Sequence, residues 1–292
     1  MMPRPSIALT AGLSLALALA GAARAQITVT LRDGSSVRAT ALSLQGATRL
    51  SLTPEGGGAA RVVEAATVER VDMPQPAILT EAYAALAAGE NIKTLQTMGK
   101  MRVELDPLKK IPGGREWWLE GEFLRAHILL SQRRTKELEE AMKAIAADTT
   151  DPVSQRRAQV FLAHLTGLAG DPRQALEALR ALILNARDPE TLADAWLFTG
   201  QHRSAVNEPA EALIAFLRVP VFYPALPVPM AYARLGAARC HVALEDLPAA
   251  RRVLGTLIKE QGTSPAGQEA RKLLSEVEKT LGITSTATDA SQ

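Results

Sequence analysis

The chain has 292 residues, of which 47% are hydrophobic and only 4% aromatic, with a single cysteine. This Ala- and Leu-rich composition favours α-helix, and it excludes collagen, a disulfide-stapled miniprotein and an intrinsically disordered chain. The 33 basic and 31 acidic residues leave a formal charge of +2.

Residues 1–25 have the pattern of an export signal. Arg4 supplies a short positive region, and the stretch from Ile7 to Ala20 is apolar. The sequence Ala23-Arg24-Ala25 then matches a small-x-small cleavage site. The apolar run is shorter than the roughly 20 residues that span a bilayer, although an uncleaved anchor or a buried helix is the alternative. We expect a signal peptide that is removed before Gln26, and hence a periplasmic or secreted protein.

Removal of this leader changes the charge balance. Residues 1–25 contain two basic residues and no acidic one, so 31 basic and 31 acidic residues remain. A neutral chain has no overall field to draw it to nucleic acid or an anionic membrane. No cysteine follows the apolar run, which excludes a lipid-modified terminus, and no later stretch is apolar enough to predict a transmembrane helix. Cys240 is expected to be a small buried hydrophobe rather than a reactive or metal-binding thiol.

Residues 26–73 predict a small β module. Ile27, Val29 and Leu31 alternate with polar residues, which indicates a strand with one buried face. Asp33-Gly34 is a hairpin signal. Further strands are expected over Val37–Leu44, where a shift of phase suggests a bulge, and over Thr48–Thr53, Arg61–Val63 and Thr67–Val71. Five short strands form a small barrel or meander, similar to SH3-like barrels in strand count and spacing only. The segment Asp72–Pro76 is the expected linker.

Residues 77–282 contain a helical repeat. Prolines recur at positions 152, 189, 227 and 265, which gives successive intervals of 37, 38 and 38. Asp151, Asp188 and Ser264 precede three of them, and a polar cap followed by proline is a physical helix start. The cap accepts a hydrogen bond from an unpaired amide, and proline has no amide to leave unpaired.

The second helices show the same period. Small or medium side chains recur at Leu138, Ala175, Ala212 and Ala250, and a large apolar residue follows each one four residues later: Met142, Leu179, Phe216 and Leu254. Residues four apart share one helix face. The small residue lets two helices approach closely, and the larger one fills the space beside it.

This pattern resembles the tetratricopeptide repeat (TPR) family. The clearest copy contains Trp196, Gly200, Ala212, Phe216 and Pro224. The family resemblance implies a mainly α protein, a TPR-like α-solenoid of helical hairpins over residues 77–282; an irregular solenoid or bundle is the alternative. The period is longer in this chain than the roughly 34 of the family. The first pair of helices is expected over Ile78–Ala88 and Asn91–Leu105, and residues 283–292 are expected to be a disordered tail.

In this family the first helices line a groove that binds extended or helical partner segments. Carried over by position, this implies partner contacts from Gln159, His164, Arg203 and His241. We therefore expect an exported, non-enzymatic adaptor or scaffold that binds a peptide or protein in the cell envelope, without a cofactor, a metal or nucleic acid. A homo-oligomer remains compatible with the sequence. The alternatives are a structural subunit of a membrane-anchored complex, docked through the β module, and an enzyme with an unrecognised site.

The four histidines recur at nearly the repeat period. His127, His164, His202 and His241 follow one another at intervals of 37, 38 and 39 along the chain. They form either a row on the concave face, which meets a ligand or senses pH, or ordinary helix packing, which we favour. Metal binding by several of them is not expected, because helices pack about 10 Å apart whereas zinc ligands lie about 2 Å from the ion.

Three further features have two interpretations each. The proline-rich segment Val219–Met230 is expected to be extended, and Phe222 and Tyr223 within it form either a partner patch or, as we favour, part of the core between repeats. Acidic residues on the predicted helices, Glu120 among them, are expected to be solvated faces. A local basic cluster either docks an acidic partner or is a plain surface; it comprises Lys100, Arg102, Lys109, Lys110 and Arg115.

Overall fold

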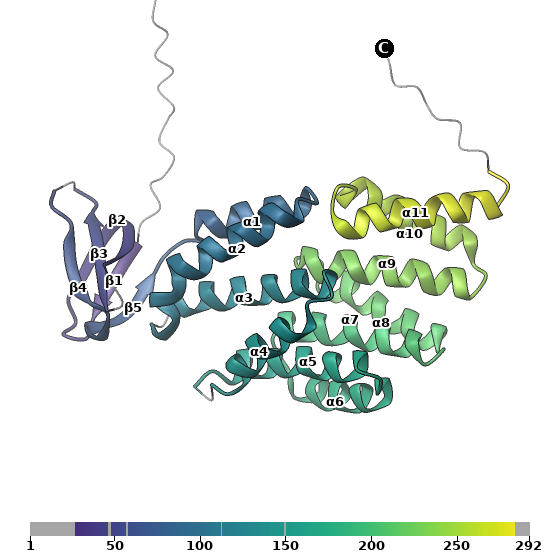
Figure 1. The fold of residues 1–292 in the computed structure, drawn as a ribbon, viewed down its shortest axis with the longest axis horizontal. Coiled ribbons are helices and arrows are strands. Elements are labelled where there is room, and N and C mark those ends of the chain that lie inside the picture. Colours follow the sequence, from purple (N-terminus) through teal and green to yellow (C-terminus); the bar gives the residue numbers. More distant parts are fainter. Residues whose placement is uncertain (1–26, 46–47, 57, 112, 149, 284–292) are drawn as a thin grey trace, which may run out of the picture. The chain divides into compact units, whose positions relative to one another are not determined.

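The structure is a computed structural model that describes residues 27–45, 48–56, 58–111, 113–148 and 150–283. The expected signal peptide and nearly all of the expected tail therefore lie outside the described residues. The chain divides into two compact units between Pro74 and Gln75, within the segment that the sequence indicates as a linker. The two units are coloured purple to blue and blue to yellow in Figure 1.

The first unit is a five-stranded antiparallel sheet. Its strands are β1 (Ile27–Leu31), β2 (Ser36–Gln45), β3 (Arg49–Pro54), β4 (Arg61–Glu64) and β5 (Val68–Asp72). They lie in the order β4-β3-β2-β1-β5. The strand order makes β1 to β4 a meander and returns β5 to the free side of β1, so that the expected small all-β unit is confirmed.

Alternation along the strands builds the core of this sheet. Val29 and Leu31 of β1 are buried, while Thr28 and Thr30 between them are only partly so. The register between β2 and β3 shifts between Ala39 and Ala41, which is the bulge suggested by the change of phase in the sequence. A bulge adds one residue to one strand and bends it.

The second unit is a consecutive array of helices. Its described residues form α1 (Ala77–Ala87), α2 (Asn91–Leu105), α3 (Gly114–Ser131), α4 (Thr135–Ala146), α5 (Pro152–Leu168), α6 (Pro172–Asn185), α7 (Pro189–Ala205), α8 (Pro209–Phe222), α9 (Pro227–Ala243), α10 (Leu247–Gln261) and α11 (Pro265–Thr280). Successive helices pair as hairpins. From α5 onward, the first helices of neighbouring hairpins also contact one another. The expected α-solenoid is confirmed.

Polar caps start the first helices as the sequence predicts. Asp151, Asp188 and Ser264 each accept hydrogen bonds from amides in the first turns of α5, α7 and α11, and proline occupies the first helical position in each. The recurring pairs on the second helices, from Leu138 and Met142 to Ala250 and Leu254, are all at most 2% exposed. Caps and paired apolar residues therefore set the boundaries and the buried face of each hairpin.

The turn inside each hairpin is repeated as well. Arg133, Gly170, Asn207 and Glu245 all have positive φ, and they follow one another at intervals of 37, 37 and 38 along the chain. At each one the next amide reaches back to a carbonyl five residues earlier, as in Asp246 N to His241 O at 2.8 Å. This is the Schellman ending of a helix. Gly89, between α1 and α2, has positive φ and the same bond, from Glu90 N to Ala85 O at 2.8 Å, whereas Gly170 differs from the others in its φ of 125°.

Close approach between hairpins depends on glycine. Gly200 on α7 and Gly236 on α9 both face the ring of Phe216 on α8, and a Cβ on either glycine would lie 2.5–2.6 Å from ring atoms. Phe216 is 2% exposed. Its ring therefore fills the space that the two glycines leave between three helices.

The proline-rich segment differs from the expectation. It is not extended: α8 continues through Pro220 to Phe222, and α9 begins at Pro227. Pro220 lies in the last turn, where its missing amide costs a single helical hydrogen bond, and the amide of Tyr223 still reaches Val219 O at 2.9 Å. None of the helices in the described part of the chain is long and apolar enough to cross a membrane.

Candidate binding cavity

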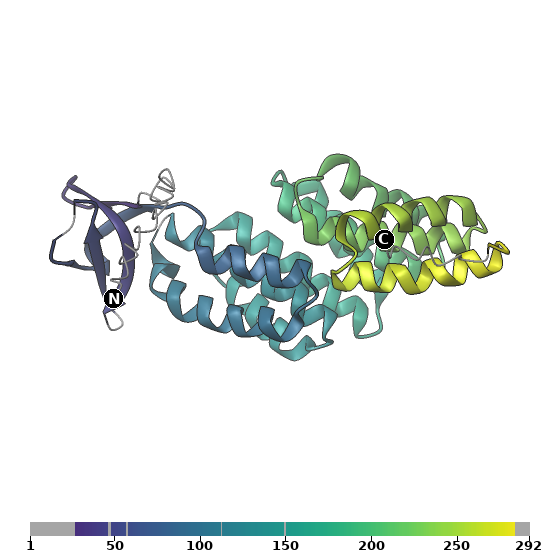
Figure 2. The same cartoon turned by 90° about the horizontal axis from the view of Figure 1, so that it is seen from above.

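The two ends of the helical array meet. The hydroxyl of Thr263, between α10 and α11, donates a hydrogen bond to the carbonyl of Ala87 at the end of α1. Gly89 lies against the same loop, because a Cβ there would be 2.4 Å from the Thr263 carbonyl oxygen. In Figures 1 and 2 the end of α1 and the start of α11 lie together. This contact closes one side of a hollow between the first and last hairpins.

A cavity of about 880 Å³ lies behind this contact. Its walls come from α1, α3, α7, α9 and α11, with the turn before α9, and most of its lining is apolar. Leu79, Trp117, Leu226, Val228 and Ala266 contribute to it. This volume falls in the range of about 300–1,000 Å³ that is usual for ligand sites.

A second cavity, of about 470 Å³, adjoins the first. It lies over α3, α5 and α7, and shares Glu116, Glu120 and Glu190 with the larger cavity. Arg157 is the one basic residue among the described residues that line either cavity. The hollow of the array is therefore apolar at one end and acidic where the two cavities join.

A chain of polar side chains runs from this hollow into the core, and we call it the polar row: Tyr83, Glu120, Arg157 and Asp194. The hydroxyl of Tyr83 donates to Glu120, Arg157 Nη1 lies 3.7 Å from Glu120, and Arg157 Nε donates to Asp194 at 2.9 Å. Each residue is 37 positions from the next, so one repeat position supplies the whole row. The row ties α1, α3, α5 and α7 together.

Burial and charge act against each other in the polar row. Asp194 is fully buried, which alone would raise its pKa, but Arg157 and then His127 outweigh burial and hold the pKa below its ordinary value. Burial alone would lower the pKa of Arg157, but the negative charges of Asp194 and Glu120 outweigh burial, so that the pKa is raised above its ordinary value. The pKa of Tyr83 is raised by burial and by the neighbouring Glu120. Tyr83 is therefore a neutral donor that holds the Glu120 carboxylate.

Three of the four histidines lie in the core beside this row. His127 Nε2 is 2.9 Å from Asp194 Oδ1, and His164 Nδ1 is 2.9 Å from His202 Nε2. The ring of His164 stacks on Phe198 at 4.0 Å. Burial, and then His202 and His127, lower the pKa of His164 to about 3. His241 is partly exposed and lies 3.5 Å from Asp246. For three of the histidines, the position in the repeat is thus a packing position.

The residues expected to line a groove lie in different surroundings. Gln159 is exposed on α5, and Arg203 pairs with Glu208 at the turn after α7. His164 is only 3% exposed, so its ring offers no surface to a partner. None of these residues, nor His241, is among the described residues that line the two cavities.

The two aromatic residues of the proline-rich segment are also separate from the cavities. Phe222 is 64% exposed at the end of α8, so the interpretation that it is tucked into the core is wrong. Tyr223 is partly buried, with its ring 6.3 Å from that of Phe222. Met230 is buried. This segment therefore presents one aromatic side chain to solvent.

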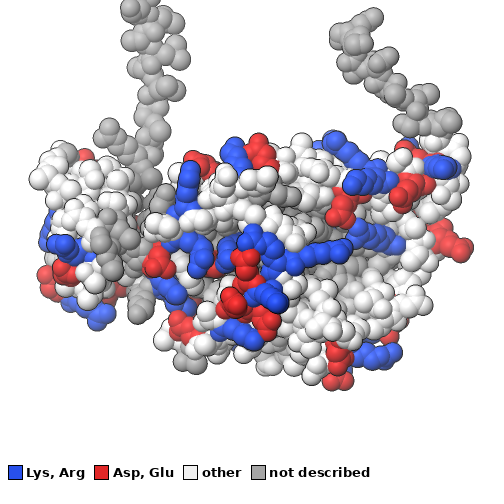
Figure 3. All heavy atoms as spheres, in the orientation of Figure 1, with Lys and Arg blue, Asp and Glu red and all other residues white. Residues whose placement is uncertain are grey.

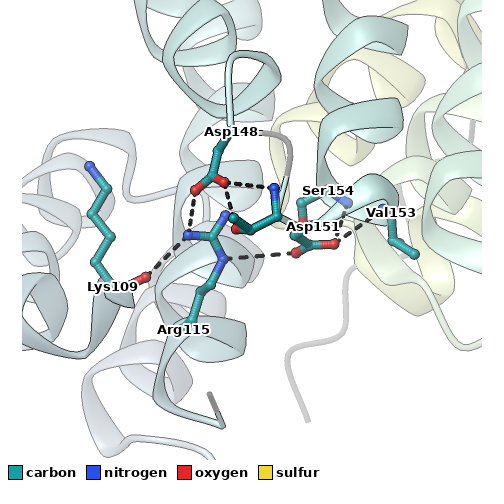
Figure 4. Close-up of polar contacts among 7 residues, drawn as sticks. Lys109, Arg115, Asp148, Asp151, Val153 and Ser154 are labelled. Atoms are coloured by element: carbon teal, nitrogen blue, oxygen red, sulfur yellow. Dashed lines mark hydrogen bonds and ion pairs between the residues drawn. The ribbon is translucent and has the colours of Figure 1, made fainter. Parts of the chain in front are cut away.

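The basic cluster is largely engaged by other side chains. Arg102 pairs with Glu122 at 3.0 Å, and Arg115 with Asp148 at 2.9 Å; Figure 4 shows Arg115 held between Asp148, Asp151 and the carbonyl of Lys109. Lys109 also lies over the ring of Trp118. The side chain of Lys110 lies outside what the structure describes. On the face drawn in Figure 3, basic and acidic side chains are interspersed.

Most residues that line the cavity were not identified from the sequence. Glu120 was expected to be a solvated residue, and Tyr83 and Arg157, like the buried Asp194 behind them, were not singled out. Their regular spacing, equal to the repeat, is a signal that could have found them. Within the described residues no group of three or more His, Cys, Asp or Glu side chains is placed to hold a metal ion. Cys240 is buried, and burial raises its pKa.

Comparison with known proteins adds no relative: no protein-family model matches the chain, and no curated protein is significantly similar to it.

Proposed function

We propose that this protein is an exported, non-enzymatic adaptor whose TPR-like helical array binds a segment of a protein partner in the cell envelope. The observation that carries the proposal is the 880 Å³ cavity between the first and last hairpins. It is lined almost wholly by first helices and the turns next to them, the part of each repeat that the family resemblance implies for binding.

The lining recurs with the repeat, which supports a site built by the array as a whole. Glu116, Glu190, Val228 and Ala266 occupy equivalent positions, since the first interval is twice the repeat and the next two equal it. All four line the larger cavity. Stacked hairpins commonly present equivalent positions along one continuous surface. An extended segment that lies across several hairpins would meet these residues in turn.

The polar row supports binding rather than catalysis. Asp194 and Glu120 share Arg157, and Tyr83 donates to Glu120, so the buried polar groups are engaged with one another. Such a network holds helices in register. The apolar wall beside it gives shape and burial to a ligand, which is what an adaptor needs.

The proposed location rests on the leader alone. Residues 1–25 supply the positive, apolar and small-residue regions of an export signal. If the protein is exported to the cell envelope, its partner is in the cell envelope as well.

Site-specific photocrosslinking in the native cells tests the proposal. A photoreactive residue at Val228, in the cavity wall, is compared with one at Arg180 on the outer helix α6 and one at Arg38 in the sheet, both exposed. We expect one envelope protein to be trapped from Val228 and not from Arg180. Trapping from Arg38 alone would contradict the cavity and favour a structural subunit docked through the β unit.

A further inference from the structure

We propose that the partner segment in the cavity is apolar and carries a Lys or Arg side chain, which lies against Glu116 and Glu190 where the two cavities join. This inference rests on the proposed function, since it names the chemistry of the segment that the adaptor would bind. It is argued from the walls, the charges and the shape of the hollow.

The walls require an apolar ligand. Leu226 and Val228 line the larger cavity and are partly exposed, and the partly exposed rings of Trp117 and Tyr232 lie in the same lining. Apolar surface gains free energy when it leaves water, and an apolar side chain seated here would cover these residues. A wholly polar segment would lose hydration against the same walls without compensation.

The charges require a cation. Glu116, Glu120 and Glu190 line both cavities, and no Lys or Arg is found among the described residues that line the larger one. Arg157, in the smaller cavity, forms ion pairs with both Asp194 and Glu120 and is also attracted by Glu190, so one guanidinium serves three carboxylates. Glu116 and Glu190 are left as the carboxylates that an incoming cation would meet, at the edge of apolar walls that weaken screening.

The shape favours a peptide segment over a small cation. The apolar walls lie mainly in one cavity, while the shared carboxylates lie at its junction with the second. An occupant must be elongated to fill the first cavity and also reach the second. A short segment with apolar residues on either side of one basic residue has this form.

Binding of peptide libraries to the purified chain tests the inference. The probes are N-acetylated, C-amidated pentapeptides with Lys, Leu or Glu at the centre and mixtures of Ala, Val and Leu elsewhere, measured by fluorescence anisotropy. We expect the Lys-centred library to bind at least tenfold more tightly than either of the others, and its affinity to fall as salt is raised. The salt dependence is measured on the parent protein, so the result does not depend on whether a variant folds.

Matched variants locate the preference. Glu116→Gln/Glu190→Gln keeps the shape of both side chains, and should bring the Lys- and Leu-centred libraries to within threefold of each other. Glu140→Gln/Glu211→Gln is the control: both residues are exposed on second helices, and Glu211 shares with Glu116 and Glu190 a place in the first turn of its helix. The control should keep the full preference.

The outcomes separate this inference from the proposed function. Equal binding of all three libraries, or competition by n-butylammonium as strong as by the Lys-centred peptides, would overturn the cationic segment and leave the adaptor standing. Failure of every library, while Val228 still traps a partner in cells, would also overturn the inference alone. Failure of both experiments would remove the adaptor with it.

Discussion

Phe216 is a residue at which the packing of the helical array is tightly constrained. Its ring lies between Gly200 and Gly236, with no room for a methyl group on either side. A methyl group inserted into a filled core forces side chains or backbone to move, which typically costs about 1–3 kcal/mol. Helices α7, α8 and α9 thus pack closely because the ring of Phe216 lies directly against the backbones of two glycines.

We expect Gly236→Ala to lower the free energy of unfolding by about 2 kcal/mol, because its Cβ would overlap the Phe216 ring. Gly255→Ala is the control, since Gly255 is in α10 with open space around it, and should instead stabilise by about 0.5–1 kcal/mol. Urea unfolding measures both. In the background Phe216→Leu, the cost of Gly236→Ala should become smaller; an unchanged cost would show that the ring is not its cause.

His164 should make stability depend on pH. Its folded pKa of about 3 lies below the value of about 6.5 in an unfolded chain. The unfolded state therefore binds more protons between these values, so stability is full above pH 6.5 and is lost as the pH falls toward 3. The slope is about 1.4 kcal/mol per pH unit for one such group.

The variant His164→Gln carries no charge at any of these pH values and keeps a donor for His202. Between pH 4.5 and 6 its free energy of unfolding should vary less steeply than that of the parent, by about 1.4 kcal/mol per pH unit. Urea unfolding at a series of pH values supplies the comparison. Parallel curves would mean that His164 is not held neutral by its surroundings.

At the scale of elements, the hairpin turns place residues of different types at positive φ, which is 57–61° at Arg133, Asn207 and Glu245 and 125° at Gly170. Gly89 and Gly170 have no side chain to strain at positive φ; Arg133, Asn207 and Glu245 adopt it at a cost of about 1–2 kcal/mol each, less for Asn. The tertiary packing of the hairpins overrides the local preference at these positions.

We expect Glu245→Gly to stabilise the protein by up to about 1 kcal/mol, because strain relief exceeds the added freedom of the unfolded chain. Asn207→Gly should have a smaller effect, since Asn tolerates this conformation better. Thermal unfolding of the two variants beside the parent gives the order. A destabilising Glu245→Gly would show that its side chain contributes a contact that outweighs the strain.

The hairpins were predictable from the sequence because their boundaries are encoded locally. Asp151 and Pro152, or Ser264 and Pro265, fix a helix start within two residues, and alternation fixes β1 in the same way. Pro220 was misjudged because proline is tolerated in a last turn, where one hydrogen bond is lost rather than several.

The cavity was not predictable by the same route. Its existence depends on where α11 arrives relative to α1, which is the sum of small rotations at every interface between hairpins. The residue pattern within one repeat does not predict the summed rotation of all the hairpins. The polar row lies between these cases, because the spacing of Tyr83, Glu120, Arg157 and Asp194 is visible in the sequence while their pairing is not.

At the scale of the whole molecule, the contact between the two ends of the helical unit should be sensitive to Gly89. Gly89→Ala would place a Cβ against the Thr263 carbonyl, whereas at Gly170, also at positive φ, a Cβ meets nothing within 4 Å. We expect Gly89→Ala to increase amide hydrogen exchange in α1 and in the first turn of α11. Gly170→Ala controls for backbone strain and should leave both segments unchanged; an equal increase in the two variants would contradict the closing role of the contact.

The leader makes a prediction for the whole chain. When the protein is expressed in its own cells, we expect the purified chain to begin at Gln26, because cleavage follows Ala25. Intact-mass measurement and sequencing of the terminal peptide decide the point. Recovery of an amino terminus at Met1 or Met2 would contradict export by this route.

The hydrogen bond between Thr263 and Ala87 also limits how the number of repeats can change during evolution. An open array gains or loses a terminal repeat at the expense of one interface. Here, loss of α5 and α6 would remove one of the rotations between neighbouring hairpins that bring α11 to α1. The contact between these two helices would be lost, and the hollow would lose a wall. The number of hairpins therefore determines the shape of the site, and duplication or deletion of a hairpin would change the specificity of the site as well as the length of the molecule.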